Sequence, residues 1–379
     1  MGNEAVLIAA ISGRALAASA RRGGYLPLVV DFFGDQDTVA AAHAHVTLCG
    51  GLALGFRERE LMEAFEHFAV RHAPIGIVCG TGFEDRPQLL AQLAQRWPLF
   101  GNDADKVARV KDPEIFAAVC RHCNIAHPRV SLSPPLVRKS WVAKRRGGSG
   151  GRHVAAASPS ACGEDVYYQS RVPGTPVSVL LLANGVSAVM LGFSEQWACP
   201  TSHQPFRYGG AVRPAGIAPR VADLLAESAC RLAAALSLTG LNSADFMVDG
   251  DDFWILEINP RPGATLDIFE PDGGSLFSLH MTACAGDLID EPPRLDGAKA
   301  SAILYAEGDV IVPQRFEWPN WSADRPNAGI AIRAREPLCT VHADAPTAAQ
   351  ARALVDERLA LVRTWMHDWT HDRICTNTP

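Results

Sequence analysis

The most constraining feature of this sequence is a hairpin whose two strands carry polar groups among apolar ones. An apolar segment ending at Val248 and a second one beginning at Phe253 flank the turn sequence Asp-Gly-Asp-Asp, which favours two antiparallel strands. Because side chains alternate between the faces of a strand, Glu257 and Asn259 share one face, and Asp245 can lie opposite them on the partner strand. The pattern predicts two carboxylates and one amide on one face of a sheet.

Oxygen donors brought together in this way favour a positively charged partner. An ion such as Mg²⁺ takes few protein ligands and completes its shell with phosphate oxygens and water. Asp245, Glu257 and Asn259 are therefore the predicted ligands of Mg²⁺, or of Mn²⁺, in a metal–nucleotide site. Pro260-Arg261-Pro262-Gly263 follows directly and places an arginine beside the same face. The alternative interpretation is a solvated hairpin with ordinary surface acids.

A lysine and a glycine-rich loop form a second candidate for nucleotide binding. Trp141–Lys144 has the pattern of a strand that ends in lysine. Five small residues follow shortly after it: Gly147, Gly148, Ser149, Gly150 and Gly151. The backbone amides of such a loop can close over phosphates. The order differs from a Walker loop, in which Lys and Ser/Thr follow the glycines, and a flexible surface hairpin is the alternative.

The chain begins with the pattern of a parallel βαβ unit. Ala5–Ala9 is an apolar run, a turn at Ser12-Gly13-Arg14 follows, a helix runs to Ala20, and a second apolar strand, Leu26–Val30, comes after a glycine pair. Of the glycine fingerprint that binds dinucleotides, only Gly13 is present. The prediction therefore stops at a Rossmann-like architecture.

Two breaks in the sequence predict three domains. The alternation of strands and helices continues to about Phe100, and proline and glycine cluster again between Glu291 and Gly297. We therefore expect a Rossmann-like domain over residues 1–100, a nucleotide-binding domain over 101–297 and a small C-terminal domain over 298–379.

Composition argues for a folded protein that acts on small molecules. The 379 residues are 48% hydrophobic and 20% charged, and the net charge of −6 offers no overall positive field for nucleic acid. The longest apolar runs fall far short of the roughly 20 residues that span a bilayer. The 10 cysteines are scattered, which favours a reducing compartment. We expect a cytoplasmic protein with small-molecule partners and with neither nucleic acid nor a membrane as partner.

Taken together, these motifs resemble the ATP-grasp superfamily. The resemblance rests on Leu256–Gly263 with Asp245 upstream, on Lys144 before the glycine-rich loop, and on Tyr168–Gly174, which resembles the adenine hinge and its following turn. The domain order resembles the biotin carboxylase and PurK-like branch. Within the superfamily the chain looks most similar to predicted ATP-dependent carboligases linked to methanofuran- and methanopterin-type coenzymes.

The resemblance implies a fold of mixed α/β and α+β class. A Rossmann-like pre-ATP-grasp domain would precede a two-lobed ATP-grasp domain over 101–297 and a small C-terminal domain. It implies that Lys144 binds the α- and β-phosphates and that the glycine-rich loop covers them. Arg261 would face an acyl phosphate or a substrate carboxylate, for which a planar guanidinium is well suited. The residues implied to contact adenine are Gln169, Ser170, Arg171 and Val172.

One position departs from the pattern of this family. Asp112-Pro113 stands where most relatives have Asp-Lys, so the second phosphate-binding lysine is missing from its usual place. Lys111 and Arg109 are both open as substitutes. No motif identifies the residues that contact the substrates; Gly13, Arg14 and Arg207 are the candidates.

The implied reaction is the Mg²⁺-ATP-dependent joining of a carboxylate and an amine through an acyl phosphate, with Lys144 and Arg261 as the catalytic residues. Biosynthesis of a one-carbon coenzyme of the methanofuran or methanopterin type is the implied context, and a homodimer is one expected assembly. Two alternatives stay open: a carboxylase-like enzyme that activates bicarbonate, and an ATP-binding regulatory protein without catalysis.

Overall fold

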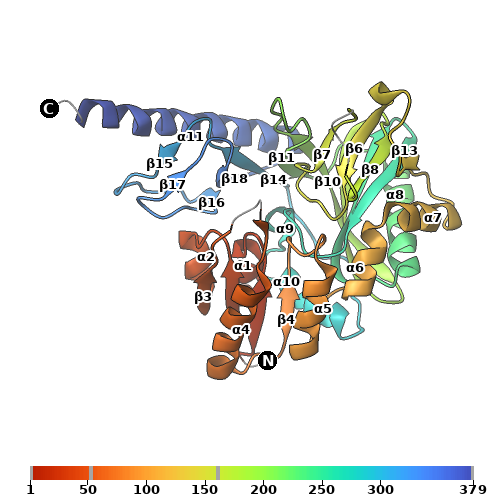
Figure 1. Cartoon of the computed structure of the whole chain (residues 1–379), viewed down its shortest axis with the longest axis horizontal. Coiled ribbons are helices and arrows are strands. Elements are labelled where there is room, and N and C mark those ends of the chain that lie inside the picture. The colour runs from red at the N-terminus through yellow and green to blue at the C-terminus, as the bar shows by residue number, and fades with distance from the viewer. Residues whose placement is uncertain (1–2, 51–53, 159–162, 377–379) are drawn as a thin grey trace.

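The computed structural model describes residues 3–50, 54–158 and 163–376, with side chains to residue 369. Figure 1 shows an N-terminal α/β unit, a central unit of two lobes, and a C-terminal unit edged by a long helix. This arrangement confirms the fold class expected from the sequence. No helix in the described ranges is both long and apolar enough to cross a membrane.

The N-terminal unit is a parallel sheet in the order β3-β2-β1-β4, flanked by helices. Its strands are apolar on both faces, as parallel strands covered by helices are. The turn after β1 requires glycine at position 13, because a Cβ there would lie 2.4 Å from the Val29 side chain. The elements are β1 (Ala5–Ala9), α1 (Arg14–Arg22), β2 (Leu26–Asp31), α2 (Gln36–Ala41), β3 (Ala44–Thr47), α4 (Glu58–His72), β4 (Ile77–Cys79) and α5 (Pro87–Arg96).

A small lobe follows, consisting of two helices and an antiparallel sheet in the order β5-β8-β6-β7. The helices are α6 (Ala104–Lys111) and α7 (Pro113–His122), and Asp112 caps the second by accepting hydrogen bonds from two backbone N–H groups. Its other elements are β5 (Val130–Ser131), the 3₁₀ turn η1 (Arg138–Ser140), β6 (Trp141–Arg145), β7 (Val154–Ala156) and β8 (Val166–Ser170). The glycine-rich segment connects β6 to β7, so it is the loop of a hairpin.

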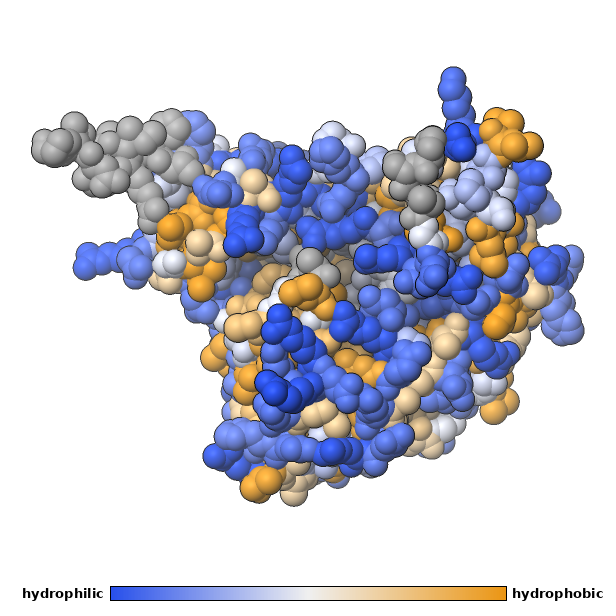
Figure 2. All heavy atoms as spheres, viewed as in Figure 1, coloured by the Kyte–Doolittle hydropathy of each residue, from blue (hydrophilic) through white to orange (hydrophobic). Residues whose placement is uncertain are grey.

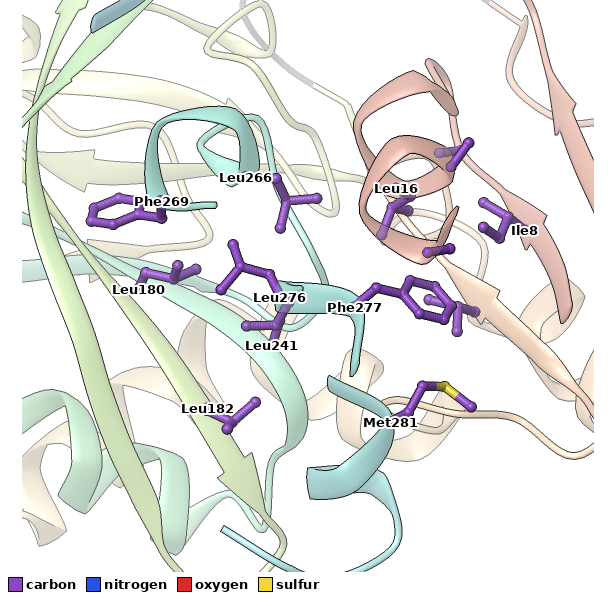
Figure 3. Close-up of a cluster of buried hydrophobic side chains, with 14 of the residues drawn as sticks. Ile8, Leu16, Leu180, Leu182, Leu241, Leu266, Phe269, Leu276, Phe277 and Met281 are labelled. Carbon is purple, nitrogen blue, oxygen red and sulfur yellow. The ribbon is translucent and has the colours of Figure 1, made fainter. Parts of the chain in front are cut away.

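The second lobe is built on a large antiparallel sheet in the order β13-β12-β9-β10-β11-β14-β18-β16. One face packs on α8 (Pro219–Ala235) and the other on α9 (Leu266–Phe269) and α10 (Leu276–Cys284). Figure 3 shows how Leu180, Leu182 and Leu241 of the sheet meet these short helices and α1 of the N-terminal unit. The strands are β9 (Thr175–Asn184), β10 (Ala188–Ala198), β11 (Tyr208–Arg213), β12 (Thr239–Asp249) and β13 (Asp252–Asn259).

The C-terminal unit continues the same sheet. β14 (Ala298–Tyr305) pairs with β11 on one side and with β18 (Pro337–Ala345) on the other. The long helix α11 (Ala348–Thr376) packs its apolar residues on these strands, together with Trp318 and Trp321. Three short strands complete the unit: β15 (Val310–Ile311), β16 (Ser322–Ala323) and β17 (Ala331–Ile332).

Two buried polar side chains join the N-terminal unit to the large sheet. Asn102 donates to the side chain of Asn242 at 2.8 Å and to the Pro260 carbonyl at 3.0 Å. His280 accepts the Leu241 N–H at Nδ1, at 2.9 Å, and its Nε2 lies 3.1 Å from the Phe100 carbonyl. Since a carbonyl can only accept, this pair of partners requires the neutral ring with its proton on Nε2.

We expect His280 to make the fold sensitive to mild acid. Burial lowers the pKa of His280 to about 4, whereas an unfolded histidine titrates near 6.5. As pH falls below about 6.5 the unfolded chain binds the proton first, so the free energy of unfolding should fall by up to about 1.4 kcal/mol per pH unit until about pH 4. Urea denaturation between pH 7.5 and 5 measures this slope.

The matched pair of variants is His280→Gln, which should reduce the slope, and His122→Gln at the exposed end of α7, which should not. Equal slopes in wild type and His280→Gln would show that this ring does not control the acid response.

Candidate active site

The three oxygen-bearing residues of the hairpin do come together. Asp245 and Glu257 are direct cross-strand neighbours on β12 and β13, and Asn259 pairs with Ser243 two residues farther along each strand. The Asn259 amide donates to Asp245 Oδ2 at 2.9 Å, and the Ser178 hydroxyl donates to Asp245 Oδ1 at 2.6 Å. The hairpin therefore offers two carboxylates and one amide on a single face.

Two lysines face these oxygens from the small lobe. Lys144 Nζ lies 3.4 Å from Glu257 Oε2, and its side chain is only 6% exposed. Lys111 Nζ donates to Asn259 Oδ1 at 3.1 Å, whereas Arg109 is exposed. Of the two candidates for the missing phosphate-binding lysine, Lys111 therefore lies at the site, and Arg109 lies on the surface.

The charges at this site are strongly coupled. Burial alone would raise the pKa of Glu257, but the positive charges of Lys144 and Lys111 hold it well below its usual range. Burial and the charge of Glu257 raise the pKa of Asp245. Although burial would lower the pKa of Lys144, Tyr167 and Glu257 together raise it. A cation in addition to these two lysines would relieve the repulsion between the two carboxylates.

These residues fit a nucleotide-bound Mg²⁺. Among the described residues there is no group of three or more His, Cys, Asp and Glu side chains that could hold a metal by itself. Two carboxylates and an amide oxygen are the small set of hard donors with which Mg²⁺ combines phosphate oxygens and water. Asn259 Nδ2 now points at Asp245, so the amide would have to turn its oxygen toward a bound ion.

The glycine-rich loop is tightly packed, and at two of its positions the contact is with distant parts of the chain. Gly147 has a φ of +66°, and a Cβ there would lie 2.5 Å from the backbone of Glu84 and Asp85 in the N-terminal unit. A Cβ at Gly151 would lie 1.8 Å from the Phe206 carbonyl, and the Tyr208 N–H donates to the Gly150 carbonyl at 3.0 Å. The loop therefore lies between the N-terminal unit and the segment before β11.

With MgATP as the expected substrate, Gly147→Ala should lower kcat/KM by about tenfold to 10²-fold, because the new Cβ must displace the loop from Glu84 and Asp85. Gly150→Ala is the matched control, since its φ of +64° gives similar strain but no atom lies within 4 Å of its Cβ. Steady-state ADP release measures both variants. Similar losses in the two would mean that strain, and not the contact, explains the effect.

A pocket joins the expected adenine hinge to the side of the site where phosphates are expected. Its lining includes Lys111, Gly147, His153, Gln169 and Glu257. Burial lowers the pKa of His153 to about 4, so this ring is neutral at neutral pH. Apolar walls with a few polar groups are typical of small-molecule sites.

Of the four residues expected to contact adenine, Gln169 lines the pocket, whereas Ser170, Arg171 and Val172 are not part of its lining. Gln169 is buried, and its amide donates to the Leu256 carbonyl at 3.2 Å, within reach of the pocket. The Ser170 hydroxyl accepts the Arg129 N–H, and the Arg171 N–H donates to the Ser140 carbonyl. Val172 follows at the strand end and is partly exposed.

Arg261 is held by a residue that the sequence did not single out. Its Nε donates to Glu84 Oε1 at 2.7 Å, and the side chains are 12% and 3% exposed. Burial would raise the pKa of Glu84, but Arg261 and Lys111 hold it below its usual value. Glu84 follows β4, at the carboxyl end of a parallel strand, where ligands commonly bind. This position in the sequence could have indicated that Glu84 belongs to the site.

The candidate substrate contacts lie on other elements: Gly13 and Arg14 at the start of α1, and Arg207 directly before β11. Arg14 contacts Asp37, Asp267 and Asp324 at the junction with the C-terminal unit. Arg207 is buried, donates to the Cys199 carbonyl and lies 3.6 Å from the ring centre of Tyr305. Its contacts are therefore with the protein's own groups.

Comparison with known proteins finds a likeness for the central unit. A family model described as an ATP-grasp domain matches residues 118–265. This segment is therefore similar to ATP-grasp domains. The match includes Lys144, the glycine-rich loop, Asp245 and the Glu257–Asn259 segment, but it ends before the C-terminal unit.

Curated relatives resemble this chain over part of their length. The carbamoyl phosphate synthase large chain of Myxococcus xanthus is 23% identical over 245 residues, which cover 56% of this chain and 22% of the relative. The formate-dependent phosphoribosylglycinamide formyltransferase of Thioalkalivibrio sulfidiphilus is 31% identical over 112 residues, 29% of this chain and 28% of the relative. The chain thus spans about a quarter of the length of each of these relatives.

Solved structures extend the likeness of fold to nearly the whole chain. Biotin carboxylase from Campylobacter jejuni, solved as a complex with β,γ-ATP, gives a TM-score of 0.73 at 15% identity and covers 92% of this chain and 89% of its own. The biotin carboxylase domain of the Hydrogenobacter thermophilus 2-oxoglutarate carboxylase, a dimer solved with MgADP and bicarbonate, gives 0.71 at 12% identity over 92% and 87%.

Proposed function

We propose that this chain is a Mg²⁺-ATP-dependent ligase that joins a carboxylate to an amine. The observation that carries the proposal is the meeting of Lys111 and Lys144 with Asp245, Glu257 and Asn259 at one end of a pocket. A triphosphate requires positive charges that neutralise it, and its metal ion requires oxygen ligands. The two lysines and the three oxygen-bearing side chains provide both. The ATP-grasp match and the nucleotide complexes of the related folds support it.

In the proposed reaction a carboxylate oxygen of the acid attacks the γ-phosphorus of ATP, and ADP leaves. The amine nitrogen then attacks the acyl carbon, phosphate leaves, and the nitrogen loses its proton. Lys144 and Lys111 neutralise phosphate charge, and Arg261, fixed in place by Glu84, presents its guanidinium to the acyl phosphate. The glycine-rich loop excludes water that would hydrolyse the intermediate.

Asp245, Glu257 and Asn259 would hold Mg²⁺ or Mn²⁺. The ion would supply charge neutralisation at the transferring phosphoryl group. The chain's own residues set the charge of that site: the lysines keep Glu257 ionised, and the Ser178 hydroxyl orients Asp245.

A screen for ADP release over amino acids and other carboxylates tests the ligase. Hydroxylamine in place of the amine should convert the correct acid to a hydroxamate, and mass spectrometry of the full reaction should show a product heavier than the acid by the amine less water. The resemblance to carboligases of methanofuran- and methanopterin-type coenzymes makes amino acids such as glutamate the first acids to test. ADP release without dependence on any acid or amine would contradict the proposal.

Activation of bicarbonate is the second candidate. The likeness to biotin carboxylase includes the C-terminal unit and covers 92% of this chain, and one such relative was solved with bicarbonate. ADP release that depends on bicarbonate and needs no organic acid would favour this function over the ligase. A homodimer is a related proposal, since that relative is a dimer, and light scattering of the purified chain tests it.

A further inference from the structure

A pocket separate from the one at the adenine hinge lies where the N-terminal unit meets the large sheet. Its lining comes from the end of β4 and the turn after it, from α5, α6 and α10, and from the segment after β13, and Figure 1 shows these elements close together. We call it the interface pocket and define it by Phe83, Leu90, Leu99, Phe100, Val107 and Arg261. It lies at the carboxyl end of a parallel strand, where open α/β sheets bind ligands.

The walls of the interface pocket are mostly apolar. Its aliphatic and aromatic side chains come from the turn after β4, from α5, from the segment that leads into α6, and from α6 itself. Burial raises the pKa of Cys79, so the thiol in this lining is uncharged too. The surface of the molecule is largely hydrophilic in the view of Figure 2, so this lining differs from its surroundings. Such walls favour an apolar group over a hydrated one.

The polar side chains in this lining are largely occupied by the protein itself. Glu84 Oε2 accepts the N–H groups of Gly82 and Phe83, at 2.9 Å and 3.1 Å. The Asn102 amide and both ring nitrogens of His280 have the partners described above. Because a buried water needs two to four polar partners, water in this pocket would be held weakly, and an apolar group that displaced it would gain affinity.

Arg261 has donors to spare in the interface pocket. Its Nε donates to Glu84, its Nη1 lies 3.5 Å from the Pro262 carbonyl, and in the described part of the chain nothing accepts a hydrogen bond from its Nη2. A guanidinium has five N–H groups in one plane, and two parallel ones match the two oxygens of a carboxylate. The ion pair with Glu84 holds that plane in place. A carboxylate at Arg261 with an apolar body in the pocket would match both parts of the lining.

The interface pocket adjoins the residues expected to bind phosphate and metal. Helix α6 lines both pockets, with Val107 at this one and Lys111, one turn farther on, at the other. Arg261 follows Asn259, the last residue of β13, by two residues. A carboxylate at Arg261 would therefore be close to the expected position of the γ-phosphate.

We infer that the acid joined by the proposed ligase is a monocarboxylate with an apolar chain, which binds in the interface pocket while its carboxylate meets Arg261. The inference rests on the proposed function and adds the chemical class of the acid to it. Glutamate or another dicarboxylate would place a second charge against apolar walls.

Binding of simple carboxylates to the full chain tests the inference without turnover. Acetate, propanoate and butanoate are titrated by calorimetry at one ionic strength in the presence of MgADP. The dissociation constant should fall by roughly fourfold for each added CH₂, which is the effect of burying that group. Equal affinities for acetate and butanoate, or no binding of any of the three, would overturn the inference.

Two analogues of butanoate separate the effect of charge from that of the apolar chain. Succinate has the same number of carbons and a second carboxylate, and butanamide has a neutral amide in place of the carboxylate. Both should bind at least about tenfold more weakly than butanoate, because succinate brings a charge to the apolar walls and butanamide lacks the charge that Arg261 meets. Succinate binding as tight as that of butanoate would contradict the inference.

Leu99→Gln places an amide in the apolar lining, at a partly exposed position where the fold should tolerate it. It should weaken butanoate binding by about tenfold and acetate binding by less than about threefold, because the longer acid reaches the wall. Leu224→Gln, at an exposed position on α8, is the matched control and should bind both acids as the wild type does. Equal losses for acetate and butanoate in folded Leu99→Gln would count against the pocket; if this variant does not fold, the series in the wild type decides.

Turnover distinguishes this inference from the proposed ligase. ADP release with a dicarboxylate or another polar acid, and with no apolar acid, would leave the ligase standing and remove the apolar class of acid. Butanoate binding tighter than that of acetate and succinate, in a chain that releases ADP with no combination of acid and amine, would keep the pocket and contradict the ligase.

Discussion

Replacing Glu257 by glutamine is expected to slow ADP release by about 10²–10³-fold while leaving the fold intact. The substitution keeps the shape of the side chain but removes the charge that faces Lys144 and lies opposite Asp245. The site then has one carboxylate to offer a metal–phosphate complex. Steady-state ADP release, with circular dichroism to verify folding, measures the effect.

Asp249→Asn is the control for this variant, because Asp249 lies exposed at the end of β12 on the same hairpin. It should be as active as the wild type. Turnover by Glu257→Gln within tenfold of wild type would remove the metal and phosphate roles from the hairpin. If the variant lost turnover and yet replaced the wild type fully in cells, the third interpretation, an ATP-binding regulatory protein, would gain support.

Arg14→Met should have the largest effect on stability, with a loss of about 3–5 kcal/mol in the free energy of unfolding. The Arg14 side chain is 10% exposed and contacts Asp37, Asp267 and Asp324. Its removal leaves carboxylates from the N-terminal unit, α9 and the C-terminal unit facing one another without a cation. Urea denaturation at pH 7.5 measures the loss.

Arg22→Met is the matched control on the same helix, because Arg22 is 48% exposed in its ion pair with Glu270. It should cost less than about 1 kcal/mol. The double variant Arg14→Met/Asp267→Asn should recover part of the loss if charge repulsion is its cause. An Arg14→Met loss no greater than that of Arg22→Met would show that the ion pairs around Arg14 contribute little.

The pH dependence of the Arg14→Met loss has a definite sign. Burial would raise the pKa of Asp267, but the charge of Arg14 holds this pKa well below its usual range. A carboxylate with a lowered folded-state pKa stabilises the fold above the unfolded value near 3.9 and loses that contribution as pH falls. The difference between wild type and Arg14→Met should therefore shrink as the pH is lowered through about 4.

Local sequence patterns were sufficient for the fold class and for the hairpin. Alternation along β13 put Glu257 and Asn259 on one face. The turn set the register only as far as Phe246 and Ile255, and an irregularity in the ladder after that pair, which the sequence did not indicate, brings Glu257 opposite Asp245. The apolar strand of β1 and the turn at Gly13 likewise predicted a parallel unit, because few other structures bury such strands on both faces.

Contacts between the units were beyond the reach of the sequence. Glu84 and Arg261 are 177 residues apart, and Arg14 and Asp324 are 310 apart, so no spacing indicates either pair. The choice between Lys111 and Arg109 depended on how α6 lies against the hairpin. Asp112-Pro113 proved to be the start of α7, which places Lys111 at the end of α6, within reach of Asn259.

The pairing of β11 with β14 limits how this chain can be cut. The two strands form a ladder from Gly210↔Ala302 to Arg213↔Lys299, so the sheet passes without a break from one unit into the next. A fragment that stopped before β14 would leave the N–H and C=O groups of β11 unpaired along an open edge. Such edges recruit other strands and promote aggregation. Exchanging modules between relatives should therefore succeed only when the strands on both sides of this ladder are transferred together.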